Sequence, residues 1–166
     1  FIDPASTSIF SISNNQLTQG SIGSGSSLFN HHFGMTMTTR FVQRYGGKTD
    51  KDPSVAKDMT FEFAGDDDVW LYIDGVLICD LGGIHNHATT SINFESGEIK
   101  VNGNKVGTIR EKLEKYYKDD SYYRKDTLAD DTYHTMKLFY LERGGMDSNL
   151  AMRFNLAHVP ETDGYK

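Results

Sequence analysis

Apolar residues at every second position are the feature that most constrains how this chain can fold. Phe33, Met35 and Met37 alternate with small or polar neighbours, and similar two-residue periods recur further along. A period of two places successive side chains on opposite faces of an extended strand, so that one face is buried. The segments with this character are residues 33–41, 59–63, 69–73, 135–141 and 150–156.

Turn signals join these segments into hairpins. Asp74-Gly75 is a two-residue hairpin signal, and it returns the chain as a strand over Val76–Asp80. Ser96-Gly97 separates another predicted pair, Ser91–Phe94 and Glu98–Val101. Several short strands with such turns predict an all-β fold, an antiparallel β-sandwich or barrel.

One segment departs from the two-residue period. In residues 107–118, Ile109 and Leu113 begin an apolar recurrence at three and four positions, with charges between. Thr108 is suited to cap a helix, with Glu111 three residues on. We therefore expect a short amphipathic helix inserted between strands.

The length of 166 residues suggests one domain. We expect an irregular lead-in at 1–30 packed on the domain, a β-sandwich domain at 31–159 and a tail at 160–166. The helical insertion occupies about residues 104–131. The sequence shows neither an initiator Met nor a signal peptide, which leads us to expect a monomeric module from a larger multidomain chain.

Composition narrows the classes of partner. The net charge of −6 argues against nucleic acid, and no stretch approaches the ~20 apolar residues of a membrane helix, so we expect no membrane insertion. The single cysteine, Cys79, lies in an apolar run and is expected to be a core residue.

Three adjacent carboxylates lie between two predicted strands, in the run Gly65-Asp66-Asp67-Asp68. Neighbouring like charges repel, and a hard cation with oxygen ligands, such as calcium, would neutralise them. The alternative is a solvated acidic turn. An EF-hand is excluded, because a loop starting at Asp66 has Leu71 where that loop needs Gly. We expect the loop at 142–149 to lie at the same end of the sheets.

Two motifs carry a resemblance to a known family. The run from Gly65 to Gly75 (GDDDVWLYIDG), continued by Asp80 to His85 (DLGGIH), closely resembles the core signature of PA14 domains, most of all their fibro-slime branch. Leu138 to Arg143 (LFYLER) and Ser148 to Leu150 (SNL) resemble that branch's closing strand pair. The similarity covers roughly residues 33–157.

The resemblance implies an antiparallel β-sandwich or barrel that binds one calcium ion. Two adjacent aspartates in the first loop, here Asp66 and Asp67, would hold the metal, and the peptide bond between them is commonly cis in the family. A second loop, here 143–149, would complete the shell with the Asp147 side chain and the Gly145 carbonyl.

The resemblance also implies a function. The chain would be a non-catalytic, calcium-dependent carbohydrate-binding (lectin) module of a secreted or cell-surface bacterial adhesin, with cell-surface glycans or polysaccharide as partners. A sugar diol would replace water on the calcium. The alternative is a structural or peptide-binding spacer module with a purely stabilising calcium. The residues expected around the ligand are Asp68, His85, Met146, Ser148 and Asn149.

Other constellations support weaker hypotheses. Four histidines suggest zinc, but their spacing is poor and no cysteine is near in sequence. Carboxylate pairs could serve glycoside hydrolysis, but turns explain them better. A tyrosine group could stack a ligand or pack a helix on the sheet. The residues are His31, His32, His85 and His87; Asp68, Asp74 and Asp80; and Tyr116, Tyr117, Tyr122 and Tyr123.

Overall fold

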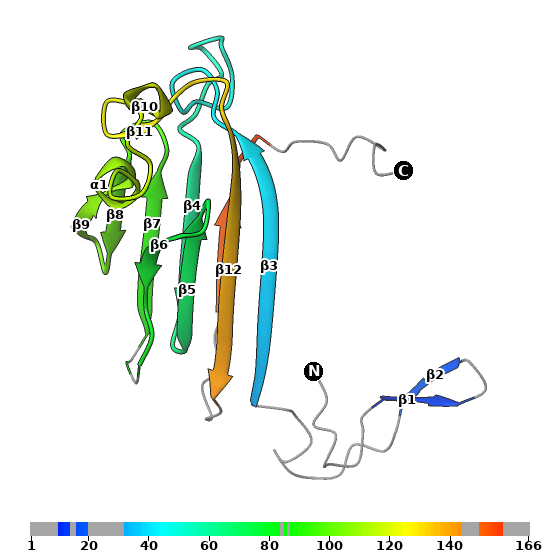
Figure 1. Cartoon of the computed structure of the whole chain (residues 1–166). Helices are drawn as coiled ribbons and strands as arrows, with labels where there is room; N and C mark the ends of the chain where they lie inside the picture. Colours follow the sequence, from blue (N-terminus) through cyan, green and yellow to red (C-terminus); the bar gives the residue numbers. More distant parts are fainter. Residues whose placement is uncertain are drawn as a thin grey trace, which may run out of the picture.

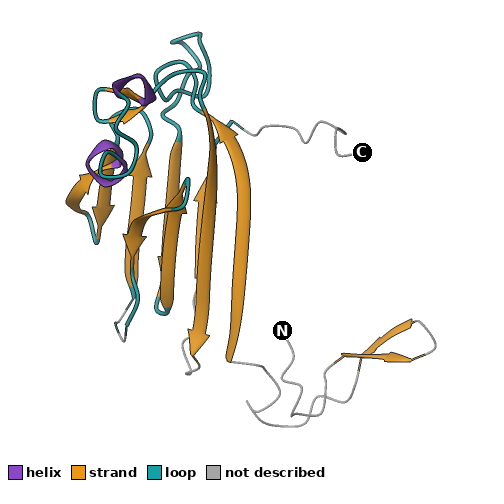
Figure 2. Ribbon diagram, in the orientation of Figure 1, coloured by secondary structure: helices purple, strands orange, loops and turns teal. Residues whose placement is uncertain are grey.

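The fold is an antiparallel β-sandwich, which confirms the all-β prediction (Figures 1 and 2). A computed structural model describes residues 10–13, 16–19, 32–83, 85, 87–143 and 150–157. The four-stranded sheet has the order β3-β12-β5-β6, and the five-stranded sheet the order β13-β4-β7-β8-β9.

The strands of the first sheet are β3 (His32–Val42), β12 (Tyr133–Arg143), β5 (Asp68–Ile73) and β6 (Val76–Asp80). Those of the second are β13 (Leu150–Phe154), β4 (Thr60–Gly65), β7 (Ala88–Asn93), β8 (Glu98–Val101) and β9 (Asn104–Thr108). The remaining elements are the hairpin β1 (Phe10–Ser13) and β2 (Gln16–Gln19), helix α1 (Ile109–Leu113), a 3-10 turn (Asp120–Tyr122), and the hairpin β10 (Tyr123–Arg124) and β11 (Thr127–Leu128).

The core lies between the two sheets and is built by the two-residue alternation. Along β5, Val69, Leu71 and Ile73 are completely buried, whereas the intervening Trp70 and Tyr72 are half-buried. The two layers meet through aromatic contacts such as Phe63–Tyr140, with ring centroids 6.3 Å apart. Apolar burial on this scale is the main driving force for folding.

The Asp74-Gly75 hairpin is confirmed. Asp74 has φ +48° and Gly75 has φ +80°, the pair of positive angles that a two-residue type I′ turn requires. Cys79 is buried, as expected, and its thiol donates to the Thr90 hydroxyl at 3.2 Å. Burial raises the pKa of the Cys79 thiol.

The helical insertion is shorter than predicted. Helix α1 spans Ile109–Leu113 only, although Thr108 and Glu111 form the expected capping box. Beyond Leu113 the side chains make tertiary contacts in place of further helical turns. The Tyr117 hydroxyl, for example, donates to the Asp74 carbonyl at 2.7 Å. Strand β9 was not predicted, since its residues are largely exposed and show no alternation.

Three connections between the sheets lie at one end of the sandwich, which we call the acidic end (Figure 1). Residues 66–67 join β4 to β5, residues 81–87 join β6 to β7, and residues 144–149 join β12 to β13. The register explains this grouping, because Asp68 pairs with Leu141 and Gly65 pairs with Leu150. The strand ends on either side of the first and third loops thus lie at one end, whereas residues 144–149 themselves lie outside the described residues.

Candidate functional site

The acidic end holds carboxylates with little access to solvent. Asp67 is 9% exposed, Asp68 4% and Glu142 2%, and Asp66 is half-buried. Charged side chains are rarely this buried unless opposite charges, hydrogen bonds or a metal ion compensate them. Asp67 and Asp68 are therefore largely shielded from solvent, whereas Asp66 is half-buried.

Asp68 fixes the loop that follows β6. Its Oδ1 accepts a hydrogen bond from the Gly83 backbone N–H at 2.5 Å. Next to it, the Leu81 N–H donates to the Val69 carbonyl at 2.8 Å. His85 belongs to the same loop, and its Nε2 donates to the Leu81 carbonyl at 2.8 Å. The 81–87 loop is thus tied by hydrogen bonds to the start of β5.

Tyr140 and Glu142 bring β12 into the site. The Tyr140 hydroxyl donates to Glu142 Oε2 at 2.7 Å, and both side chains are buried. Burial raises the pKa of Tyr140, and the charges of Glu142, Asp67 and Asp66 raise it further. Each of these three carboxylates therefore disfavours ionisation of the Tyr140 hydroxyl.

Glu142 was not among the residues predicted for the site. The signal for it is the same alternation that defines the strand, since Leu138, Tyr140 and Glu142 occupy every second position of β12 and all are buried. A charged residue that continues an inward-facing series is unexpected in a core. Its position at the strand end places it beside the acidic turn.

The donor set is all oxygen, which fits the preference of calcium. Among the described residues, however, no group of three or more His, Cys, Asp or Glu side chains is arranged to hold a metal ion. The described backbone also has no cis peptide bond, so the cis bond expected between Asp66 and Asp67 is not found. The predicted residues Gly145, Met146, Asp147, Ser148 and Asn149 lie outside the described residues.

A second polar cluster lies at the opposite end of β5 and holds the insertion in place. The Asp74 carboxylate accepts hydrogen bonds from His134 Nδ1 at 2.6 Å, the Thr135 N–H at 2.7 Å and the Tyr122 hydroxyl. Tyr122 stacks on Tyr117, with ring centroids 4.8 Å apart. The packing interpretation of these tyrosines is confirmed, whereas Tyr116 is 70% exposed.

This arrangement does not match the carboxylate pair considered for glycoside hydrolysis. Asp68 and Asp74 flank the six-residue length of β5, about 20 Å apart at ~3.3 Å per residue. Asp80 instead accepts from the Gly82 N–H at 2.8 Å, which shapes its own loop. The zinc hypothesis is not supported by the two histidines of this loop. His85 bonds to the carbonyl of Leu81 in its own loop, and His87 is exposed.

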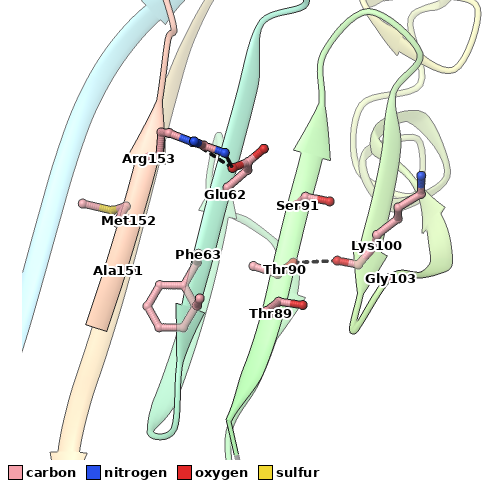
Figure 3. A pocket seen from close by; sticks show the side chains of 11 residues that line it. Glu62, Phe63, Thr89, Thr90, Ser91, Lys100, Gly103, Ala151, Met152 and Arg153 are labelled. Carbon is pink, nitrogen blue, oxygen red and sulfur yellow. Dashed lines mark hydrogen bonds and ion pairs between the residues drawn. The ribbon is translucent and has the colours of Figure 1, made fainter. Parts of the chain in front are cut away.

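A pocket of about 450 Å³ lies on the five-stranded sheet (Figure 3). Its charged residues are paired within the protein, because Arg153 Nε donates to Glu62 Oε2 at 2.9 Å and Lys100 lies 2.8 Å from Glu98. Thr90 donates to the Lys100 carbonyl at 2.9 Å. The charged side chains of this pocket therefore already have partners within the protein.

Comparison with known proteins finds similarity to proteins of Dictyostelium discoideum. Protein psiQ is 41% identical over 66 residues, which is 40% of this chain and 6% of psiQ. Protein psiR is 39% identical over 66 residues, covering 40% of this chain and 5% of psiR, and protein psiH is 39% identical over 69 residues, covering 42% and 8%. The matched segments thus span less than a tenth of each of these relatives. No family model and no solved structure matches the chain.

These relatives overturn the expected function. They come from a eukaryote, so the assignment to a bacterial adhesin is wrong, and nothing in their names points to a lectin. No helix in the described part of the chain is long and apolar enough to cross a membrane.

Proposed function

We propose that this chain is a non-catalytic module of a larger, psi-like protein, and that its acidic end binds one calcium ion which fixes the connecting loops. The observation that carries the proposal is the burial of Asp67, Asp68 and Glu142 where the two sheets are joined. The resemblance of the turn and the following hairpin to PA14 domains is part of the same proposal.

Hard-ion chemistry supports the choice of metal. Calcium takes six to eight oxygen ligands in a flexible geometry, so carboxylates from a turn and a strand end suit it better than zinc. Asp66 and Asp67 would hold the ion, and the charge of Glu142, which like theirs raises the pKa of Tyr140, would favour a cation at this end. Asp68 has a separate role, because it already receives the Gly83 N–H.

The ion would supply positive charge where like charges are crowded. Removing it would leave carboxylates of low exposure close together, which costs free energy. Asp66 and Asp67 lie in the turn that joins β4 to β5 and thereby the two sheets. Repulsion between them would therefore lower the stability of the whole sandwich. The role proposed for the metal is thus structural, and it shapes the loop surface that this end presents.

Thermal unfolding with and without calcium tests the proposal. With calcium at about 100 times its dissociation constant, binding adds about 2.7 kcal/mol, which raises Tm by about 5–10 °C for a domain of this size. Asp67→Asn should lose most of that rise. Magnesium at the same concentration should give a smaller one, because it demands tighter octahedral geometry.

Asp126→Asn is the matched control. Asp126 is exposed and lies between β10 and β11, at the end of the sandwich opposite the acidic end (Figure 1). It should keep the full calcium response. Equal Tm values in calcium and in chelator for the unaltered chain would rule out a stabilising ion.

A further inference from the structure

The side chain of His134 is almost completely buried, and both of its ring nitrogens face oxygen atoms. Nδ1 lies 2.6 Å from Asp74 Oδ2, and Nε2 lies 2.6 Å from Thr132 Oγ1. A ring nitrogen that carries a proton donates a hydrogen bond, and one without a proton accepts it. The roles of these two oxygen atoms therefore decide the charge of the ring.

The hydroxyl of Thr132 acts as an acceptor toward this ring. Thr132 Oγ1 lies 2.5 Å from the Ala129 carbonyl oxygen. A carbonyl oxygen has no proton to give, so the hydroxyl proton of Thr132 occupies this short contact. Because a hydroxyl has one proton, none is left for the contact with His134. Nε2 of His134 therefore carries a proton and donates it to Thr132.

The carboxylate of Asp74 is an acceptor as well. Its Oδ1 accepts the Thr135 N–H at 2.7 Å, and its Oδ2 accepts the Tyr122 hydroxyl. Burial raises the pKa of Asp74, but these bonds and the one from His134 outweigh it, so that the pKa is lowered. An ionised carboxylate has no proton to give. Nδ1 of His134 therefore carries a proton too.

The other groups around the ring supply no competing charge. The Tyr122 hydroxyl lies 3.3 Å from Nδ1. Burial, together with the hydrogen bond to Asp74 and its charge, raises the pKa of Tyr122, so this hydroxyl stays neutral. On β3, the Phe41 ring lies 5.5 Å from the His134 ring between centroids and is apolar. Among the described residues, the titratable side chains in contact with His134 are thus Asp74 and Tyr122.

The same contacts follow the order of a hydroxyl–histidine–carboxylate triad, Thr132, His134 and Asp74. In a catalytic triad, the hydroxyl donates its proton to a neutral histidine, which acts as general base. Here the Thr132 proton is already engaged by the Ala129 carbonyl, and a histidine with two protons cannot accept another. The arrangement therefore does not activate Thr132 as a nucleophile.

We propose that His134 carries both ring protons at neutral pH, and that its charge, paired with the Asp74 carboxylate, is a pH-sensitive switch that holds the insertion. Tyr122 in the insertion and Thr132 just after it both bond to this pair. When His134 loses a proton, one ring nitrogen becomes an acceptor that faces another acceptor. The buried Asp74 charge also loses its counter-charge, which is costly. The insertion should therefore loosen as pH rises, whether or not calcium binds.

NMR of the ring nitrogens in the full chain tests the charge of His134. At about pH 7.5 an ordinary histidine, with a pKa of about 6.5, is about nine-tenths neutral, whereas His134 should show two ring N–H protons. Thr132→Val keeps the branched shape without the hydroxyl and should lose the Nε2 proton. Thr132→Ser keeps the hydroxyl and should retain both protons. Thr135→Val is the matched control, because it keeps the backbone N–H that bonds to Asp74, and it should also retain both.

Hydrogen exchange of the Ala129 amide tests the switch, because this N–H donates to the Tyr122 carbonyl at 3.0 Å. Its protection factor, which corrects for the intrinsic effect of pH, should fall at least tenfold over the pH range in which His134 loses a proton. The β5 amides should stay protected. Any of three results would overturn the proposal: a single ring proton in the unaltered chain at about pH 7.5, Ala129 protection that stays constant while His134 loses a proton, or both ring protons kept up to about pH 9.5.

Discussion

At the scale of single residues, Asp74 connects more of the molecule than its place in a hairpin turn suggests. Its carboxylate accepts hydrogen bonds from His134, Thr135 and Tyr122, and its carbonyl accepts one from Tyr117. Burial opposes ionisation of Asp74, but the bonds from His134, the Thr135 N–H and Tyr122 outweigh it and lower the pKa of Asp74. One side chain thereby couples the hairpin, β12 and the insertion.

Replacing this carboxylate should be costly. Asn tolerates the positive φ of +48° at this position, so Asp74→Asn keeps the turn. It removes the charge and replaces one of the two acceptor oxygens with an NH2 group, which cannot accept a hydrogen bond. We expect a loss of about 2 kcal/mol, the size of one strong charge-assisted hydrogen bond, and a fall in Tm of about 4–8 °C by calorimetry.

The same variant carries a pH signature. Because the pKa of Asp74 is lowered in the folded state, its contribution is complete above the unfolded value of about 4 and is lost as pH falls through the folded pKa. The stability difference between the unaltered chain and Asp74→Asn should therefore narrow below about pH 4. A difference that stays constant from pH 6 to pH 3 would contradict this account.

At the scale of elements, the insertion is seated on the turn between β7 and β8. The Gly97 carbonyl accepts the Ile109 N–H at 2.8 Å, and the Asp126 carbonyl accepts the Arg110 N–H at 3.0 Å. Gly97 has φ +78°, and a Cβ there would lie 2.1 Å from the Asp126 carbonyl oxygen. No side chain fits between these two turns.

Two glycine substitutions distinguish the energetic effect of the contact between Gly97 and Asp126 from that of backbone strain. Gly103 has nearly the same φ, +77°, but a Cβ there meets nothing within 4 Å. Gly103→Ala should cost about 1–2 kcal/mol for the positive φ alone, whereas Gly97→Ala should cost about 3–4 kcal/mol because overpacking is added. Equal losses in chemical denaturation would show that the insertion does not press on this turn.

The elements also show what a single sequence can predict. The alternation in β3, β4 and β5 was sufficient, because each of these strands has one face in or against the core. Strand β13 shows the same alternation, although its Leu150 and Phe154 are 43% exposed. Strand β9 was missed because it lies at a sheet edge and is exposed, so burial leaves no pattern in it. Helix α1 was predicted too long, because Tyr117 and Tyr122 serve the Asp74 cluster rather than a longer helix.

At the scale of the whole molecule, topology creates the candidate site. The chain crosses between sheets three times at one end, so residues far apart in sequence, Asp67 and Glu142, both raise the pKa of Tyr140. The acidic turn was visible in the sequence because its carboxylates are adjacent. The part of Glu142 in the site was not visible in the sequence, because the strand register places it there. The bacterial adhesin inferred from the family resemblance was wrong, since related sequences occur in eukaryotic proteins.

Isothermal titration of the full chain with calcium is the most direct test of the central claim. We expect one binding event per chain, abolished by Asp67→Asn, retained by Asp126→Asn, and weakened by Glu142→Gln, which keeps the shape of the side chain but removes its charge. No heat of binding with millimolar calcium, or equal binding by Asp67→Asn, would contradict a metal site at the acidic end.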